Sequence, residues 1–515
     1  MNLRAISERL EHPFAWLIGE ARDTPSYLIA RWAFLRALGI VYLIAFLSFW
    51  SQIQGLIGPG GILPAESFLD LVRANLGAER YWLVPTVLWL GAGASGLNLV
   101  CGLGALGSVL LILDLWPRGW LVVLWALYLS LVGVGQDFLA FQWDALLLEA
   151  GLLAILLAPG HLLPGRHPEP PPPPLAVVLL WGLLFRLVFE SGAAKLTSGD
   201  PTWRNLTALD YHFFTQPLPT WTAWYANLLP GWLKRVAVLG TFAFEMGAPL
   251  LIVCGRRLRL YGWVGIVAMQ LLIFGTGNYT FFNLLTIALT LLLLDDRVWR
   301  RVLPRRALRW VPKTGEDHRP SPARALAVAA IGVPLVVLQL VSFYVTVVPG
   351  ASLPRAVEPV FAGLAPFRSL NSYGLFRVMT TERAEIIIEG SDDGGTWRTY
   401  EFRYKPGALD RRPAFVEPHQ PRLDWQMWFA ALDQFDRTAW FQAFAARLLQ
   451  GSPSVVRLLA SNPFPDHPPQ YLRVTLYDYR LTDRATRRAT GAWWTRTRLG
   501  LYAPILSLAD TAANR

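Results

Sequence analysis

The stretch ALAVAAIGVPLVVLQLVSFYVTV, residues 325–347, decides the fold class, because it contains no charged side chain. About 20 such residues suffice for a helix to cross the hydrocarbon core of a bilayer. The whole chain has the same character: 53% of its 515 residues are hydrophobic and only 16% are charged, against about a quarter charged in soluble domains. The 23 tryptophans suit a protein with many boundaries between water and lipid. The composition excludes disordered and coiled-coil proteins and predicts a membrane protein with several spans.

Eight further apolar stretches are long enough to be considered as spans. With the first, the predicted spans are roughly 31–51, 84–114, 118–135, 143–158, 175–194, 232–253, 260–275, 279–295 and 325–347. In 84–114, Pro85 and the glycines at 91 and 93 predict a short re-entrant or interfacial piece before the true helix. We therefore expect a mainly α polytopic protein with about nine transmembrane helices.

The arginines indicate the orientation, because basic residues gather in cytoplasmic loops. The turn 254–260 and the loop 296–324 are rich in arginine and are separated by two predicted spans. If both are cytoplasmic, the N-terminal segment lies inside and everything after residue 347 lies outside. The predicted domains are a cytoplasmic N-terminal segment 1–30, a first bundle 31–158, a proline-rich cytoplasmic linker 159–174, a second bundle 175–347 and an external region 348–515.

The basic excess does not indicate nucleic-acid binding. The formal charge is +11, and only four of the 47 basic residues are lysines. In a membrane chain such arginines are first explained by topology, so we expect no nucleic-acid partner. The two cysteines provide no metal motif or disulfide framework, and the first 25 residues predict no cleavable signal peptide.

The composition changes after residue 347. Residues 384–390, 397–404 and 471–479 alternate apolar and polar side chains, as in half-buried strands. The turn 391–395 (SDDGG) joins the first two ranges into a predicted hairpin. Trp440, Phe444 and Leu448 share one face of a predicted helix. The expected architecture is a β-rich or α+β external domain.

One motif match has a simpler structural explanation. The pattern Gly102-x-Gly104-x-x-Gly107 resembles a dinucleotide fingerprint but lies in an apolar span without a preceding strand. Close helix packing explains its small residues better. The histidines are scattered, and we expect His161 and His167, beside the proline-rich loop, to be solvated. No metal site is predicted.

Charged residues inside spans are more informative, because each is costly in a bilayer. Arg186 and Glu190 lie four residues apart in one predicted helix, which predicts an intramembrane ion pair. Lys195 follows at the external end of the same helix. It can snorkel to the water boundary, or it can act as a catalytic base, because lysine, unlike arginine, can lose its proton when partly desolvated. Both interpretations stay open.

Polar side chains gather on the predicted outer side, which indicates an external site or docking surface. The candidate cluster consists of Asp137, Gln142, Asp144, Asp200, Trp203, Asp210, Tyr211, His212, Asn278 and Asn371. Asp144 and Glu149 are about 140° apart around their helix, so we do not expect them to form a carboxylate pair.

Long segments of the sequence resemble the lipase maturation factor family. The stretches that carry the resemblance are residues 46–66 (FLSFWSQIQGLIGPGGILPAE), 135–151, 190–220, 277–286, 370–383 (LNSYGLFRVMTTER) and 388–397. The family consists of polytopic proteins of the eukaryotic endoplasmic reticulum, with bacterial relatives. The vertebrate member helps dimeric secreted lipases to fold and leave that compartment. The resemblance implies a folding factor for an immature secreted protein such as a lipase, embedded among membrane lipids and needing no cofactor.

A shorter resemblance links residues 191–196 (SGAAKL) and Trp203 to the membrane part of vitamin K-dependent γ-carboxylases. By that resemblance, Lys195 would deprotonate a hydroquinone, and the protein would be a quinone-dependent membrane enzyme. The maturation factor is the favoured interpretation and the enzyme is the alternative. Transport is a weaker third, because the charged residues do not line a path across both leaflets. The arginine bias and short loops suggest a bacterial relative, which would place the protein in the inner membrane, with the N-terminal side in and the C-terminal side out.

Overall fold

The computed structural model describes residues 13–14, 26–165, 169–311 and 322–509. Most of the predicted N-terminal segment 1–30 therefore lies outside the described residues. So do His167, within the proline-rich linker, and part of the basic loop 296–324.

Within the described residues, seven helical segments are long and apolar enough to cross a membrane, with mean hydropathies from 1.5 to 2.4. They are α3 (Leu28–Trp50), α7 (Ala94–Ile112), α8 (Pro117–Val134), α10 (Pro174–Thr197), the segment Gly231–Val253, α16 (Arg256–Thr276) and α19 (Pro322–Val347). The segment Gly231–Val253 consists of α14 (Gly231–Phe242), the π-helical turn η3 (Ala243–Gly247), α15 (Ala248–Leu250) and η4 (Leu251–Val253). The chain is an integral membrane protein.

Two of the nine predicted spans are helical but short. Helix α9 (Gln142–Leu157) has 16 residues, which gives about 24 Å. Helix α17 (Phe282–Thr290) continues into η5 (Leu291–Leu293) and reaches only about 18 Å. Neither alone covers the roughly 30 Å hydrocarbon core, but both run between the same two ends of the bundle as their neighbours. Asp295, just after η5, contacts Arg256 at the start of α16 at 2.5 Å, and the carbonyl of Ala158, just after α9, accepts from Arg118 at the start of α8 at 2.7 Å. The predicted irregular piece before α7 is the short helix η1 (Val87–Leu90).

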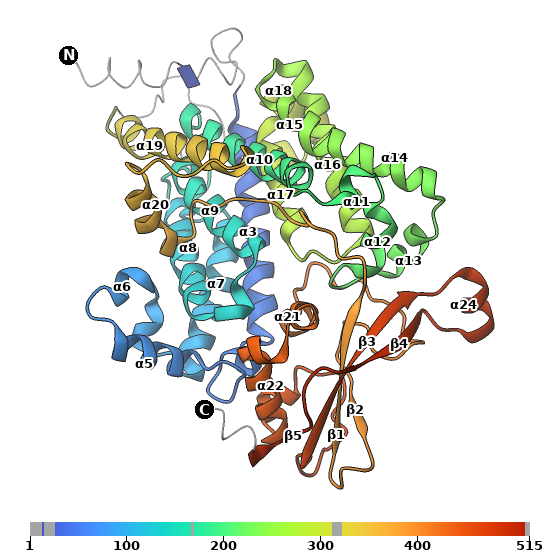
Figure 1. Ribbon diagram of the computed structural model, residues 1–515. Helices are drawn as coiled ribbons and strands as arrows, with labels where there is room; N and C mark the ends of the chain where they lie inside the picture. The colour runs from blue at the N-terminus through green and yellow to red at the C-terminus, as the bar shows by residue number, and fades with distance from the viewer. Residues whose placement is uncertain (1–12, 15–25, 166–168, 312–321, 510–515) are drawn as a thin grey trace.

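The long helices pack closely where small residues allow it. α3 lies beside α7, and α10 beside α19 (Figure 1). A Cβ atom built on Gly104 would lie 2.3 Å from the ring of Phe46, and one on Gly107 would lie 2.6 Å from Trp120. The glycines of the apparent dinucleotide motif thus serve helix packing, as their apolar surroundings predict.

Short helices fill the connections between the long ones. They are α4 (Ile53–Leu56), α5 (Ala65–Asn75), α6 (Arg80–Leu83), η2 (Gln136–Leu139), α11 (Pro201–Arg204), α12 (Ala208–Thr215), α13 (Trp221–Asn227), α18 (Asp296–Val302), η6 (Ala307–Trp310), α20 (Glu358–Leu364) and η7 (Ala365–Phe367).

The region after α19 contains an antiparallel sheet with the order β2-β1-β3-β4, and β5 also pairs with β3. Its strands are β1 (Ala384–Ser391), β2 (Arg398–Tyr400), β3 (Tyr471–Leu481), β4 (Trp494–Leu501) and β5 (Leu506–Ser507). Its helices are α21 (Arg422–Ala431), η8 (Phe435–Arg437), α22 (Ala439–Leu449), α23 (Pro453–Val456) and α24 (Arg484–Thr490). The predicted hairpin, the strand at 471–479 and the buried face of α22 are confirmed.

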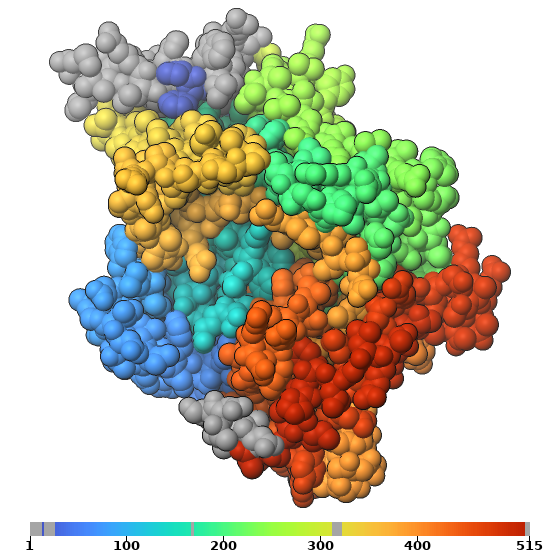
Figure 2. All heavy atoms as spheres, in the orientation of Figure 1, coloured from blue at the N-terminus to red at the C-terminus, as the bar shows by residue number. Residues whose placement is uncertain are grey.

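The sheet region and the helical bundle share one hydrophobic core. Buried side chains of α3 and α9 belong to the same cluster as those of β1, α21 and α22. The segment between η7 and β1 runs along the helices before it enters the sheet (Figures 1 and 2). The region after α19 is therefore a domain in close contact with the bundle, and the contact surface between them, called the junction below, holds most of the predicted site residues.

Candidate functional site

The centre of the junction is Arg186, which is buried in the middle of α10. Its guanidinium contacts Glu149 of α9 at 2.9 Å and Glu190 at 3.2 Å. The loop before β1 completes the site: Tyr373 donates its hydroxyl to Glu149 at 2.8 Å and its backbone N–H to Glu190 at 2.9 Å. Asn371 accepts from Arg186 through its carbonyl and donates its side-chain amide to Glu149 at 3.0 Å. The predicted Arg186–Glu190 pair is present, and it also binds the chain that leads into the sheet.

A second buried ion pair connects α9 to α21. Arg422 contacts both carboxylate oxygens of Asp144, at 2.7 and 2.9 Å. Tyr128 of α8 donates its hydroxyl to the same carboxylate at 2.5 Å. Both charged side chains are at most 1% exposed. Because a forked guanidinium matches a carboxylate in two hydrogen bonds, this contact fixes the orientation of α21 on the bundle. Asp144 and Glu149 bind different partners, as their helical spacing predicts.

Lys195 lies in the last turn of α10 and is also buried. Its Nζ atom is 2.7 and 2.9 Å from the two carboxylate oxygens of Glu245, and it donates to the carbonyl of Ser191 at 3.2 Å. The ring of Trp203 lies 5.4 Å from Nζ. An ammonium group has three donors, and three acceptors surround this one. Glu245 belongs to the π-helical turn η3, and its partnership with Lys195 was not predicted.

Asn278 joins two loops at the C-terminal end of α16. Its side-chain amide donates to the carbonyls of Leu218 and Ala414 at 3.0 and 2.9 Å. Its oxygen accepts from the backbone of Val416 at 2.8 Å and of Glu417 at 3.3 Å. With only 3% of its surface exposed, Asn278 positions the segment 414–417 against the bundle.

Burial changes the pKa values of two titratable groups near Asn278. Burial raises the pKa of Glu417 to about 8, although the backbone N–H of Tyr279 donates to its carboxylate. Burial lowers the pKa of His212 to about 4, and the charge of Lys195 adds to that shift. The Nε2 atom of His212 lies 3.3 Å from the hydroxyl of Tyr279, which donates to Gln216 at 2.8 Å. His212 is therefore neutral at pH 7.

Asp200 and Trp203 hold the segment before β1 by its backbone. Asp200 caps α11 by accepting from Thr202 at 2.7 Å and also accepts from the backbone N–H of Met379 at 2.5 Å. Trp203 donates its indole N–H to the carbonyl of Phe376 at 3.0 Å. Both side chains therefore bind main chain of the region after α19.

The remaining predicted residues have separate surroundings. Gln142 accepts from the backbone of Gly374 at 3.4 Å, whereas Asp210 pairs with Lys234 at 2.8 Å. Tyr211 is half-buried beside Phe214, and Asp137 is exposed. The ten residues thus form several contacts along the junction and do not converge on one point.

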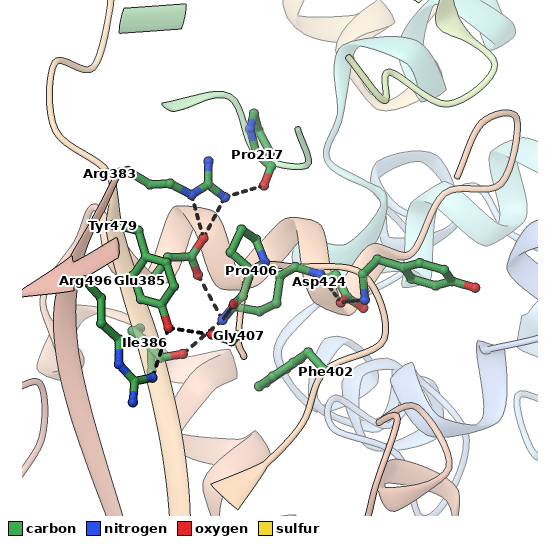
Figure 3. A network of polar contacts seen from close by, with 12 residues as sticks. Pro217, Arg383, Glu385, Ile386, Phe402, Pro406, Gly407, Asp424, Tyr479 and Arg496 are labelled. Carbon is green, nitrogen blue, oxygen red and sulfur yellow. Dashed lines mark hydrogen bonds and ion pairs between the residues drawn. The ribbon is translucent and has the colours of Figure 1, made fainter. Parts of the chain in front are cut away.

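A further buried network was missed by sequence reasoning (Figure 3). Arg383 donates to the carbonyls of Phe214 and Pro217, at 2.7 and 2.9 Å, and contacts Glu385 at 2.6 Å. Glu385 also pairs with Lys405 at 2.9 Å. The only sequence signals were one of the two glutamates of β1 and one of the four lysines. The network attaches the start of β1 to the loop after α12.

Another group of charges lies away from the sheet, at the opposite end of α3. His161 is 3.4 Å from Asp114 and 3.1 Å from Glu169, so the prediction that it is solvated is wrong. Burial alone would lower the pKa of His161, but the two carboxylates raise it to about 9. The three side chains are close enough to hold a metal ion, yet Arg36 and Arg31 already contact the two carboxylates at 2.7 and 2.5 Å. We therefore interpret this group as a charge-balanced contact between helices.

The junction has the chemistry of a structural connection. Its charged groups contact one another or main-chain atoms, and several of these contacts bridge segments more than 100 positions apart in the sequence. The base proposed for the enzyme alternative, Lys195, is engaged by Glu245. The geometry therefore lends the carboxylase-like alternative no support.

Comparisons with known proteins agree with this two-part organisation. Residues 29–301 match the family described as Lipase maturation factor transmembrane domain, and residues 369–504 match Lipase maturation factor C-terminal domain. No solved structure matches the chain.

Several relatives are similar over most of their length. Lipase maturation factor 2 of Gallus gallus is 37% identical over 93% of this chain and 81% of its own length. Lipase maturation factor 2 of Homo sapiens is 37% identical over 94% of this chain and 83% of its own length. Lipase maturation factor 1 of Bos taurus is 35% identical, covering 94% of this chain and 90% of the relative. The chain belongs to the lipase maturation factor family.

Proposed function

We propose that this protein is a membrane-anchored maturation factor that binds immature secreted proteins, with lipases as the implied class of client. The observation that carries the proposal is the similarity to lipase maturation factors across both the bundle and the region after α19. In this proposal the protein acts by binding, without a cofactor or a catalysed reaction. Its partners are the client and the surrounding membrane lipids.

The proposed orientation follows from the positive-inside rule. The turn between the segment Gly231–Val253 and α16 carries Arg256, Arg257 and Arg259, and the loop after α18 is also basic. α16 and the shorter helix formed by α17 and η5 separate these two loops, so both loops are expected on the cytoplasmic side. An odd number of spans between the segment before α3 and the region after α19 then places the sheet on the external face. In a bacterium this face is the periplasm, and in a eukaryote it is the lumen of the endoplasmic reticulum.

The junction supports this proposal by holding the sheet region rigidly on the bundle. A maturation factor that only tethered its client would need no such connection. Buried pairs such as Asp144–Arg422 fix the external surface relative to the membrane, so a bound client would be held at a defined distance from the bilayer. This is pre-organisation of a binding surface, which reduces the entropic cost of association.

A secretion assay tests the proposal. A dimeric secreted lipase is expressed in cells that lack their own maturation factor, together with the full chain or a version that ends after residue 347. The ratio of secreted lipase activity to total lipase protein is measured. We expect the full chain to raise this ratio and the truncated chain to leave it unchanged while still inserting into the membrane. An unchanged ratio with the full chain, or full rescue by the truncated chain, would overturn the proposal.

Cross-linking from the external side separates this function from the enzyme alternative. Intact cells are treated with a membrane-impermeant cross-linker, and the purified protein is analysed by mass spectrometry. Recovery of immature secreted proteins supports the maturation factor. Recovery of a quinone without any protein contradicts it.

A further inference from the structure

We propose that the free edge of strand β4 docks an extended, acidic segment of the client by adding it to the sheet as a new strand. The proposal deepens the function proposed above, and it rests on that function for the secreted nature of the partner. Its own basis is the geometry and charge of the arm formed by β3, α24 and β4, residues Tyr471–Leu501, called the β3–β4 arm below.

The two edges of the sheet differ strongly in length. One edge is β2, which has only three residues, Arg398–Tyr400. The other is β4, which has eight, Trp494–Leu501. A long edge strand exposes a row of unpaired backbone groups that can template pairing with another chain. In Figure 1, α24 lies beside α13, and Thr482 and Arg487 contact the ring of Trp224 in α13. The red segment that runs from there down β4 lies on the outer surface in Figure 2.

The backbone hydrogen bonds between β3 and β4 show which backbone groups of β4 point away from the sheet. Thr482 donates its backbone N–H to the carbonyl of Trp493, and the register pairs Arg480 with Thr495 and Asp478 with Thr497. Because hydrogen-bonded and non-hydrogen-bonded pairs alternate in an antiparallel ladder, Trp494, Arg496 and Arg498 direct their N–H groups away from β3.

The two ends of this outer edge differ. The start of β4 is covered, since Trp493 and Trp494 both donate their backbone N–H groups to the carbonyl of Leu409. Among the described residues, the backbone hydrogen bonds include none from Arg496 or Arg498 to a segment beyond that edge. These two positions are therefore open to a new strand.

The side chains of the β3–β4 arm define the chemistry of the partner. The arm carries five exposed arginines, namely Arg480, Arg484, Arg488, Arg496 and Arg498. Arg480 pairs with Asp478 at 3.0 Å. For Arg484, Arg488 and Arg498, no ion pair to a carboxylate is present among the described residues. A basic surface of this kind attracts an acidic partner and speeds its association.

The flanking apolar side chains complete the surface. Leu499 and Leu501 are 55% and 51% exposed at the end of β4. An added strand presents alternate side chains to the two faces of the sheet, so a segment that alternates acidic and apolar residues fits this edge. A second copy of the chain would bring arginine against arginine, which disfavours pairing between copies. A lipid surface would use the charges but has no backbone groups to pair with Arg496 and Arg498.

Peptide binding to the full chain in neutral phosphatidylcholine nanodiscs tests the proposal. The probes are a fluorescent ten-residue peptide of alternating Glu and Val, and a matched peptide of alternating Lys and Val. We expect the acidic peptide to bind at least about tenfold more tightly. Arg498→Pro removes an outward N–H group, which proline tolerates on an edge strand, and should weaken binding of the acidic peptide by about tenfold. Arg498→Lys keeps the charge and the N–H group and should retain binding within about twofold.

A second variant keeps the test valid if Arg498→Pro disturbs folding, which thermal unfolding would reveal. In Arg496→Glu/Arg498→Glu the backbone is unchanged, and we expect the preference to turn toward the basic peptide. Equal binding of both peptides, or unchanged binding after Arg498→Pro in a folded protein, would overturn the edge-docking proposal. So would an arm that binds phosphatidylglycerol vesicles but neither peptide.

The secretion assay distinguishes a failure of edge docking from a failure of the maturation function. If the full chain matures the lipase but shows no edge-dependent peptide binding, edge docking fails and the maturation function stands. If peptides bind at the edge but the full chain never raises lipase activity, the maturation function fails and the docking surface stands.

Discussion

Arginine has opposite roles at the junction and on the β3–β4 arm. At the junction, Arg186, Arg383 and Arg422 are at most 2% exposed, and each contacts a carboxylate as well as a main-chain carbonyl. On the arm, Arg484 and Arg488 are exposed and have no carboxylate partner among the described residues. A guanidinium in a dry interface gives direction through its fixed fork of donors, whereas one in water contributes mainly long-range charge. The comparison shows that one residue type builds the scaffold in one region and leaves a surface available for a partner in the other.

The largest effect is expected from Arg422→Met. Removing one member of a buried ion pair leaves Asp144 charged and unpaired, which costs about 3–5 kcal/mol. We expect a large fall in the midpoint of thermal unfolding, measured by tryptophan fluorescence of the purified protein in detergent. Arg498→Met, the matched control on the arm, should change stability by less than about 0.5 kcal/mol.

A double variant sharpens this test. Arg422→Met combined with Asp144→Leu removes both charges and should recover much of the lost stability, because a hydrophobic pair of similar volume often replaces a buried ion pair without loss. An unchanged unfolding midpoint in Arg422→Met would contradict the view that buried arginines stabilise the junction while exposed arginines on the arm do not.

A smaller effect is expected at Lys195, whose partner lies within the bundle. Lys195→Met should destabilise the protein by leaving Glu245 unpaired, whereas Lys195→Arg keeps a cation for Glu245 and should retain most of the stability. Under the maturation function, Lys195→Arg should also retain the secreted lipase activity of the assay above. Loss of that activity in a stable, membrane-inserted Lys195→Arg protein would instead indicate chemistry at the lysine.

The sequence predicted local features of the molecule better than its long-range contacts. Apolar runs predicted the long helices, and alternation predicted β1 and β3, because burial periodicity is a local property. The spacing of Arg186 and Glu190 predicted their pair for the same reason. Apolar composition also predicted α9 and α17, but it did not predict that these two helices are shorter than the seven others. Asp144 and Arg422 are 278 positions apart, so no local pattern could pair them. Most of the polar residues of the candidate cluster lie at the junction, a relation that no local pattern in the sequence indicates.

The stability of the junction is expected to depend on pH through Glu417, whose pKa is raised to about 8. The folded state therefore holds a proton between about pH 4.5 and 8 that the unfolded state has lost, so this group's contribution to stability falls as the pH rises through that range. Glu417→Gln cannot lose a proton. We expect the two proteins to have similar unfolding midpoints at pH 5, and the Gln variant to be the more stable one at pH 9. A constant difference between them across this range would contradict the assignment.

The smallest effect on stability is expected from Arg484→Ala/Arg488→Ala on α24. Both side chains are exposed and form no ion pair among the described residues, so the unfolding midpoint should stay within the range of ordinary surface substitutions, about 0.5 kcal/mol. Their charge should nevertheless matter for association. Salt screens exposed charges over about 10 Å at 0.1 M, so binding of the acidic peptide by the unchanged chain should weaken as salt increases. The variant should bind more weakly at low salt and depend less on salt, because fewer charges remain to be screened. A variant that lost stability but kept its salt dependence would place these two arginines with the scaffold and not with the docking surface.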